Sequence, residues 1–179
     1  SVLLGDTPKN GEQKLDEVVS TKDVVTFENC HILRCSVTSS ANYATFFATT
    51  GDNKILVKDC SALDSFIESK QSGGRAAFIA QDRGACTNID VVNFVATGEA
   101  KATNGNGVAG IMGYVCGTTI TMTNVYSDID CGAAKWAGQF VPVNRYCNVI
   151  ISNSICKGAL LGHVYELGGS GYGDVILTN

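Results

Sequence analysis

The sequence predicts an all-β protein, a single-domain parallel β-helix (β-solenoid) of five to six coils of about 30 residues each. Three observations lead to this prediction: two sequence anchors that recur in phase, segments in which every second residue is polar, and glycines that punctuate these segments. We expect a right-handed winding, with the repeats at residues 25–179 and a short N-terminal cap or irregular segment at residues 1–24.

The first anchor is a short run that ends in Asn or Asp. Equivalent positions of a solenoid stack about 4.8 Å apart, so amides at a bend can pass hydrogen bonds from coil to coil. Asn also tolerates the left-handed backbone that a sharp bend demands. We therefore expect a structural ladder with one charged member, formed by residues spaced 30, 34, 31, 29 and 26 apart: Asn29, Asp59, Asn93, Asn124, Asn153 and Asn179.

The second anchor is a small residue pair that leads into an apolar strand. It begins at Ala44, Ala76, Ala109, Ala137 and Leu161, at intervals of 32, 33, 28 and 24 residues. The segments between anchors alternate with period two, as in Thr119–Thr123, and are rich in Val, Ile, Thr and Phe. This pattern indicates strands and disfavours the paired amphipathic helices of helical repeats.

Composition excludes several classes of partner. Charged residues make up 17% of the chain, against a usual quarter, and the formal net charge is −4. Nucleic-acid binding needs clustered Lys and Arg, which are scattered here, so we expect no nucleic-acid partner. No apolar run reaches the roughly 18 residues needed to cross a bilayer, so we expect no membrane insertion.

No residue cluster predicts a catalytic, cofactor or metal site. The eight cysteines form no CxxC pair, and His31 and His163 lie far apart. The cysteines are interpreted as small buried hydrophobes, although their even number also permits disulfides. Asp128 and Asp130 share a strand face, but no carboxylate of an adjacent coil falls in register with Asp128 for glycoside chemistry. The sequence therefore leans against an enzyme and predicts no cofactor.

Aromatic residues offer the only candidate ligand contacts. Tyr and Trp are concentrated in the C-terminal half; if several are exposed on one face they could stack on sugar rings, and if they point inward they belong to the core. The residues singled out for contact with a glycan are Trp136, Tyr126 and Tyr146.

The segment Gly107–Gly132 has a glycine-rich apolar strand, a glycine turn, and then an apolar-x-Asn-x-Tyr-Ser-like stretch around Asn124. It resembles the GLUG-type repeat of parallel β-helical regions in surface and secreted proteins. The match is good in this coil and loose from Gly74 to Gly98, and the fourth and fifth coils keep the frame but lose most of the glycines. The resemblance implies an extracellular or cell-surface, adhesin-like or structural segment, and it brings no catalytic residues.

The two ends of the repeat differ. Lys9–Ser20 carries Leu15, Val18 and Val19 on one side and is expected to form a short amphipathic helix or irregular cap. The last anchor strand, Val175–Asn179, leaves an apolar edge that pairs with further coils or with another copy of the chain. The leading functional hypothesis is a non-enzymatic structural or adhesin-like module that self-associates end to end. The alternative is a carbohydrate-binding or carbohydrate-active β-helix.

Overall fold

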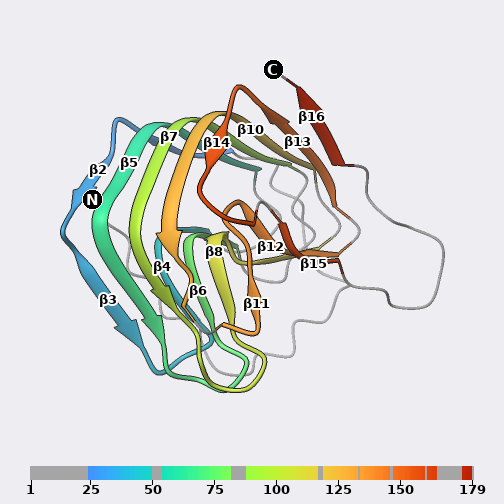
Figure 1. The fold of residues 1–179 in the computed structure, drawn as a ribbon. Helices are drawn as coiled ribbons and strands as arrows, with labels where there is room; N and C mark the ends of the chain where they lie inside the picture. Colours follow the sequence, from blue (N-terminus) through green and yellow to red (C-terminus); the bar gives the residue numbers. More distant parts are fainter. Residues whose placement is uncertain are drawn as a thin grey trace, which may run out of the picture.

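The computed structural model describes residues 24–49, 54–81, 88–116, 119–132, 134–145, 147–159, 161–164 and 175–178. Within these ranges every regular element is a β-strand, and the strands pair in parallel as the chain winds from one coil to the next (Figure 1). The predicted parallel β-solenoid is confirmed. The segment expected to form the N-terminal cap, residues 1–24, lies outside the described residues except for Val24, which begins the first strand.

The largest sheet has nine strands and forms one long flank in Figure 1. Its main path runs through β1 (Val24–Glu28), β5 (Lys54–Ser69), β7 (Asn88–Lys101), β10 (Thr119–Asp130), β13 (Asn148–Ser152) and β16 (Val175–Thr178). Three short strands continue its rungs: β2 (His31–Leu33), β3 (Ser36–Ser39) and β14 (Ile155–Cys156).

Two smaller sheets form the remaining faces of the coil. The four-stranded sheet contains β4 (Tyr43–Thr49), β6 (Arg75–Gln81), β8 (Val108–Met112) and β11 (Trp136–Ala137). The three-stranded sheet contains β9 (Tyr114–Cys116), β12 (Val141–Arg145) and β15 (Leu161–Val164).

The register of the large sheet reproduces the anchor spacing of the sequence. One row of paired residues comprises Val25, Ile55, Ile89, Ile120, Val149 and Val175, which are 30, 34, 31, 29 and 26 residues apart. The predicted count of five to six coils is slightly too high, because the structure makes about four turns. The six runs of the first anchor begin on the six strands along the main path of the nine-stranded sheet. The other two sheets have only four and three described strands.

The long strands bend at residues with left-handed backbone. In β10, Met122 and Val125 are buried, while Thr123 and Asn124 between them face outward. Asn124 has φ +56° and turns the strand there without breaking the alternation on either side. Each long strand of the nine-stranded sheet therefore turns a corner of the coil at its ladder residue.

The core is a continuous column of apolar side chains inside the coils. Phe27, Phe47 and Phe94 meet edge to face, with ring centroids 5.4 and 5.9 Å apart, and Phe46 meets Phe78 in the same way at 5.6 Å. Burying such a side chain contributes roughly 1.5–3 kcal/mol, so stacking between coils is the main stabilising term.

A buried glutamine completes the large sheet where the coils become shorter. Beyond Asn124, β10 pairs with β14 only at Tyr126 and Ser127, so the later part of β10 has no strand partner on that side among the described residues. The Gln139 side chain lies there: its Oε1 accepts from the Ile129 N–H at 3.1 Å and its Nε2 donates to the Ile129 carbonyl at 2.7 Å. Gln139 therefore replaces one rung of backbone pairing.

Candidate functional site

The ladder residues lie at the bend of the nine-stranded sheet. The five described members, Asn29, Asp59, Asn93, Asn124 and Asn153, have φ between +47° and +56°. The Asn93 amide donates to Asp59 Oδ1 at 2.6 Å, and the Asn124 amide donates to Asn93 Oδ1 at 2.9 Å. These bonds join three consecutive rungs on the outside of the coil. Asn179, the sixth predicted member, lies outside the described residues.

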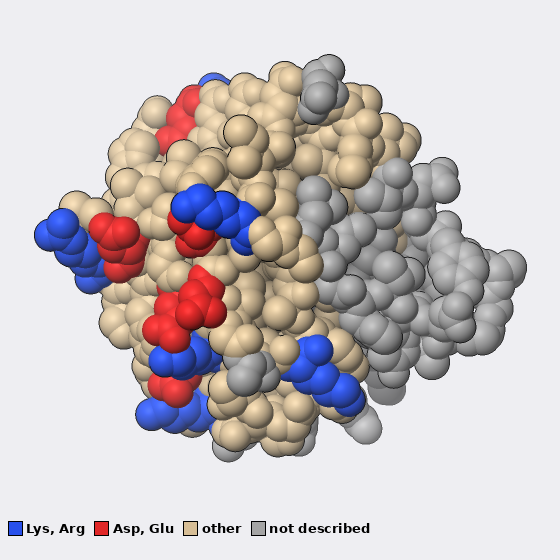
Figure 2. Space-filling view, in the orientation of Figure 1, with Lys and Arg blue, Asp and Glu red and all other residues tan. Residues whose placement is uncertain are grey.

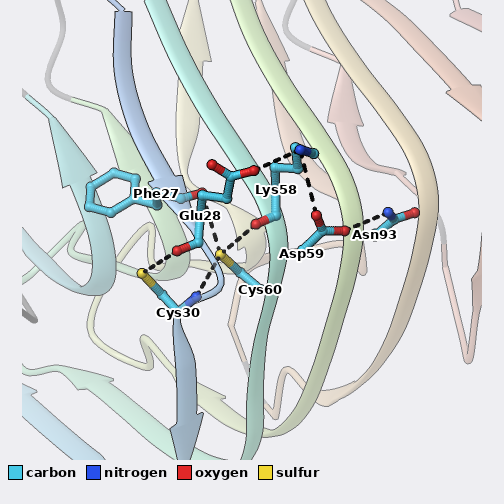
Figure 3. Close-up of polar contacts among 7 residues, drawn as sticks. All are labelled: Phe27, Glu28, Cys30, Lys58, Asp59, Cys60 and Asn93. Atoms are coloured by element: carbon cyan, nitrogen blue, oxygen red, sulfur yellow. Dashed lines mark hydrogen bonds and ion pairs between the residues drawn. The ribbon is translucent and has the colours of Figure 1, made fainter.

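Charged side chains flank the ladder in the first two coils (Figure 3). Lys58 Nζ lies 2.7 Å from Glu28 Oε1 and 3.7 Å from Asp59 Oδ2. The hydrogen bond to Glu28 raises the pKa of the Lys58 ammonium group, and attraction to both carboxylates adds to this rise. Asp59 is thereby paired with a cation on one side and with the Asn93 amide on the other, which explains how a charge is accommodated in an amide ladder.

Two cysteines stand directly behind this corner. Cys30 and Cys60 each follow a ladder residue, and their neighbours His31 and Ser61 pair in register. The Cys30 N–H donates to the Cys60 sulfur at 3.4 Å, so the sulfur of the second coil reaches the backbone of the first. Sequence reasoning missed this contact, although both cysteines follow an anchor residue and are 30 residues apart.

A partly open cavity of about 270 Å³ lies at the first coil. Its lining consists of Phe27, Asn29, Cys30, His31, Ile32, Phe46 and Phe47. Most of this lining is apolar, and Cys30 contributes a thiol. The exposed His31 ring hydrogen-bonds through Nδ1 to Ser61 Oγ at 3.0 Å. The cavity is suited to an apolar side chain rather than to a charged ligand.

The two described aromatic residues among those proposed for ligand contact lie on different sheets. Tyr126 faces outward on the nine-stranded sheet, in register with Val95 and Ile155. Trp136 is half-buried in the four-stranded sheet, with Lys135 Nζ 5.3 Å from its ring centroid. Tyr146 lies outside the described residues.

The charges beside Tyr126 are paired. Lys157 Nζ lies 2.6 Å from Asp128 Oδ2. The hydrogen bond to Asp128 makes the largest contribution to the raised pKa of Lys157, and the hydrogen bond to Tyr126 makes the next largest. The second strand carboxylate, Asp130, lies in register with Glu99, which forms its own ion pair with Lys101 at 2.6 Å. Figure 2 shows the same pattern over the visible face, where basic and acidic side chains lie side by side on a largely uncharged surface.

The described residues offer little chemistry. They contain no group of three or more His, Cys, Asp or Glu side chains that could hold a metal ion. Burial raises the pKa of Cys131 to about 11, with a further contribution from the charge of Asp130, so this thiol is protonated and inert at neutral pH.

Comparisons with protein-family models, curated proteins and solved structures find no match. In the part of the chain that the structure describes, no helix has the length and apolar character needed to cross a membrane. The candidate functional features are therefore the corner around Asn29 and Asp59, the cavity beside it, and the terminal rungs of the large sheet.

Proposed function

We propose that this protein is a non-enzymatic structural module that associates end to end through the terminal rungs of its nine-stranded sheet. One observation carries the proposal. Within the described sheet, β1 pairs only with β5 and β16 only with β13, and β16 exposes Ile176 and Leu177 to 48% and 59%. A strand edge with exposed apolar side chains is a template for pairing with another chain.

The register of the sheet indicates how two copies would join. Leu177 is in register with the buried Ile151, and so occupies an inward position, whereas Ile176 is in register with the outward-facing Ile150. On β1, Phe27 points inward and Thr26 outward. Parallel addition of β16 of one copy to β1 of the next sets Leu177 over Phe27 and Ile176 over Thr26.

The cavity of the first coil supports this arrangement. Phe27 lines it together with Phe46 and Phe47, and Leu177 at the other terminal rung is an exposed apolar side chain of suitable size. Because the two joining surfaces differ, the contact is heterologous, and its repetition along the solenoid axis would generate a filament. A filament or adhesin-like role outside the cell or at its surface agrees with the GLUG-type resemblance of Gly107–Gly132.

A pair of charge substitutions tests the proposed contact. Thr26 and Ile176 both face outward at opposite ends of the sheet, and the proposed stacking brings them to adjacent rungs about 4.8 Å apart. Thr26→Lys with Ile176→Lys places like charges opposite each other only in the assembled form. Thr26→Glu with Ile176→Lys places opposite charges there and is the matched control.

Sedimentation velocity over a concentration series, with negative-stain microscopy, measures the result. We expect concentration-dependent oligomers or filaments for the wild type, their loss in the Lys/Lys variant and their recovery in the Glu/Lys variant. A wild-type chain that stays monomeric at the highest concentration contradicts the proposal. So does equal assembly of both double variants, which would point to a contact through another surface.

A second candidate function, glycan binding, is favoured by Tyr126. This ring stands outward between the apolar side chains of Val95 and Ile155, and the Asp128–Lys157 ion pair lies beside it. An aromatic face bordered by paired polar groups suits a sugar ring. A glycan array probed with and without calcium tests it: reproducible binding that Tyr126→Ala abolishes supports the candidate, and absence of binding counts against it.

A further inference from the structure

Cys30 and Cys60 occupy equivalent positions on adjacent rungs, with the same side-chain orientation. Each thiol donates to the carbonyl two residues before it, Cys30 to Glu28 at 3.5 Å and Cys60 to Lys58 at 3.1 Å. Glu28 and Lys58 are themselves paired in register. The Cα atoms of in-register neighbours on adjacent strands lie about 4.8 Å apart, which falls within the range of about 4.4–6.8 Å that disulfides span.

The sulfur of Cys60 also leans toward the first coil (Figure 3). It lies 3.4 Å from the Cys30 nitrogen and 3.4 Å from the Phe27 carbonyl, both of which belong to the neighbouring rung. Burial raises the pKa of the Cys60 thiol, whereas the hydrogen bond from the Cys30 N–H lowers it. Because the Cys60 sulfur already reaches the Cys30 backbone, we expect that rotation of the Cys30 side chain about its Cα–Cβ bond can bring the two sulfurs to bonding distance.

We propose that Cys30 and Cys60 form a reversible disulfide that links the first coil to the second beside the cavity. The oxidant is a low-molecular-weight disulfide. The Cys30 thiolate attacks it and releases one small thiol, giving a mixed disulfide on Cys30. The Cys60 thiolate then attacks the Cys30 sulfur and releases the second small thiol. Two protein thiols are oxidised to one disulfide, and the small disulfide is reduced to two thiols.

The order of attack follows from exposure. Cys30 is partly exposed and lines the cavity, whereas Cys60 is 2% exposed. Because the attacking species is the thiolate and burial raises the pKa of Cys60, the second step is slow at neutral pH and accelerates as the pH rises. Both cysteines belong to the same chain, so the disulfide can form in a monomer. The inference is therefore independent of end-to-end association.

The second bend of the same two coils provides a matched control. The Cys35 N–H donates to Ser65 Oγ at 3.2 Å, in the same way that the Cys30 N–H contacts the Cys60 sulfur. Ser65 therefore stands where Cys60 stands at the first bend, and Cys35 has no cysteine above it among the described residues. Cys35 should form no intramolecular link, although it is exposed.

Oxidation followed by peptide mapping tests the proposal on the full chain. After incubation with oxidised glutathione, trypsin separates Cys30 (residues 23–34) from Cys35 (residues 35–54) and from Cys60 (residues 59–70). We expect the first and third peptides to be joined, with a mass lower than their sum by two hydrogen atoms. The link should be reversed by dithiothreitol, form faster at higher pH, and raise the midpoint of urea unfolding.

Variants define the geometry. Cys30→Ser and Cys60→Ser should abolish the link, and Cys35→Ser should leave it unchanged. In the double variant Cys60→Ser with Ser65→Cys, the link should instead join the peptide of residues 35–54, which contains Cys35, to the peptide of residues 59–70. Recovery of glutathione adducts on Cys30 with no cross-linked peptide would overturn the proposal, as would cross-links of Cys30 to other cysteines in place of Cys60.

Discussion

Gln139→Leu is the most informative single substitution in this protein. The Gln139 side chain is 7% exposed and makes three hydrogen bonds: Oε1 accepts from Ser127 Oγ at 2.6 Å and from the Ile129 N–H, and Nε2 donates to the Ile129 carbonyl. Leucine has a similar volume and none of these polar atoms. The substitution therefore removes the hydrogen bonds and leaves the packing nearly unchanged.

The expected loss follows from the groups left behind. The Ser127 hydroxyl retains an acceptor in the Gln139 carbonyl, 3.5 Å away. The Ile129 N–H and carbonyl lose their side-chain partner in the buried interior, and each such group costs about 1–3 kcal/mol. We expect the free energy of unfolding to fall by about 2–6 kcal/mol in total. For a chain of this size that lowers the melting temperature by about 4–24 °C.

Urea unfolding monitored by circular dichroism measures this change as a lower midpoint with an unchanged slope. Gln71→Leu, on the partly exposed turn after β5, is the control and should change stability by less than about 0.5 kcal/mol.

Gln139→Glu adds a pH test, because only the protonated acid can donate to the Ile129 carbonyl. Its folded-state pKa should lie above the unfolded value of about 4.3. The stabilisation is therefore present below that value and lost as the pH rises through the folded pKa. Wild-type stability in Gln139→Leu, or a pH-independent Gln139→Glu, would refute the view that this side chain replaces a rung.

Two further predictions concern residues with positive φ. Asn93→Gly removes the ladder bonds to Asp59 and Asn124 but accepts φ +54°, so it should cost about 1 kcal/mol, and Asn93→Ala about 1 kcal/mol more, by urea unfolding. Equal values would contradict a conformational role for Asn. Gly98→Ala places a Cβ 2.0 Å from the Ser65 carbonyl oxygen at φ +127° and should cost more than about 3 kcal/mol. Gly132→Ala, at φ +54° with nothing within 4 Å, should lose only about 1 kcal/mol and is its control.

The sheet register could be predicted from the sequence because equivalent residues of successive coils recur at intervals that can be counted in the sequence. An Asn or Asp recurs at each bend since few other residues adopt the left-handed conformation without strain, and each interval between anchors equals one register interval of the sheet. The number of turns could not be read in the same way, because the anchors mark only one of the three faces.

The contacts that distinguish individual coils were harder to predict. Gln139 lies 10 and 12 residues from its partners Ile129 and Ser127, an interval that belongs to no repeat. Arg34 and Asp64 also have positive φ and create a second bend in the first two coils. The third coil has neither Arg nor Asp at this bend; instead Gly98, which pairs with Ser65, has the positive φ there. Sequence periodicity therefore predicts the features that all coils share, but it does not predict the contacts that occur in one coil alone.

The shortening of the coils also limits how a second copy could attach. The intervals between paired residues along the large sheet fall from 34 to 31, 29 and 26 residues. On the far side of the Asn bend, the last described strand of this sheet is β14, which pairs with β10. A copy added to β16 would therefore pair through the first half of the rung, Val175–Thr178. Interfaces of this kind fall below about 1,200 Å² and are weak, so assembly should require high protein concentration. In so small a contact, the charge at the Thr26 and Ile176 positions should be enough to decide whether two copies associate.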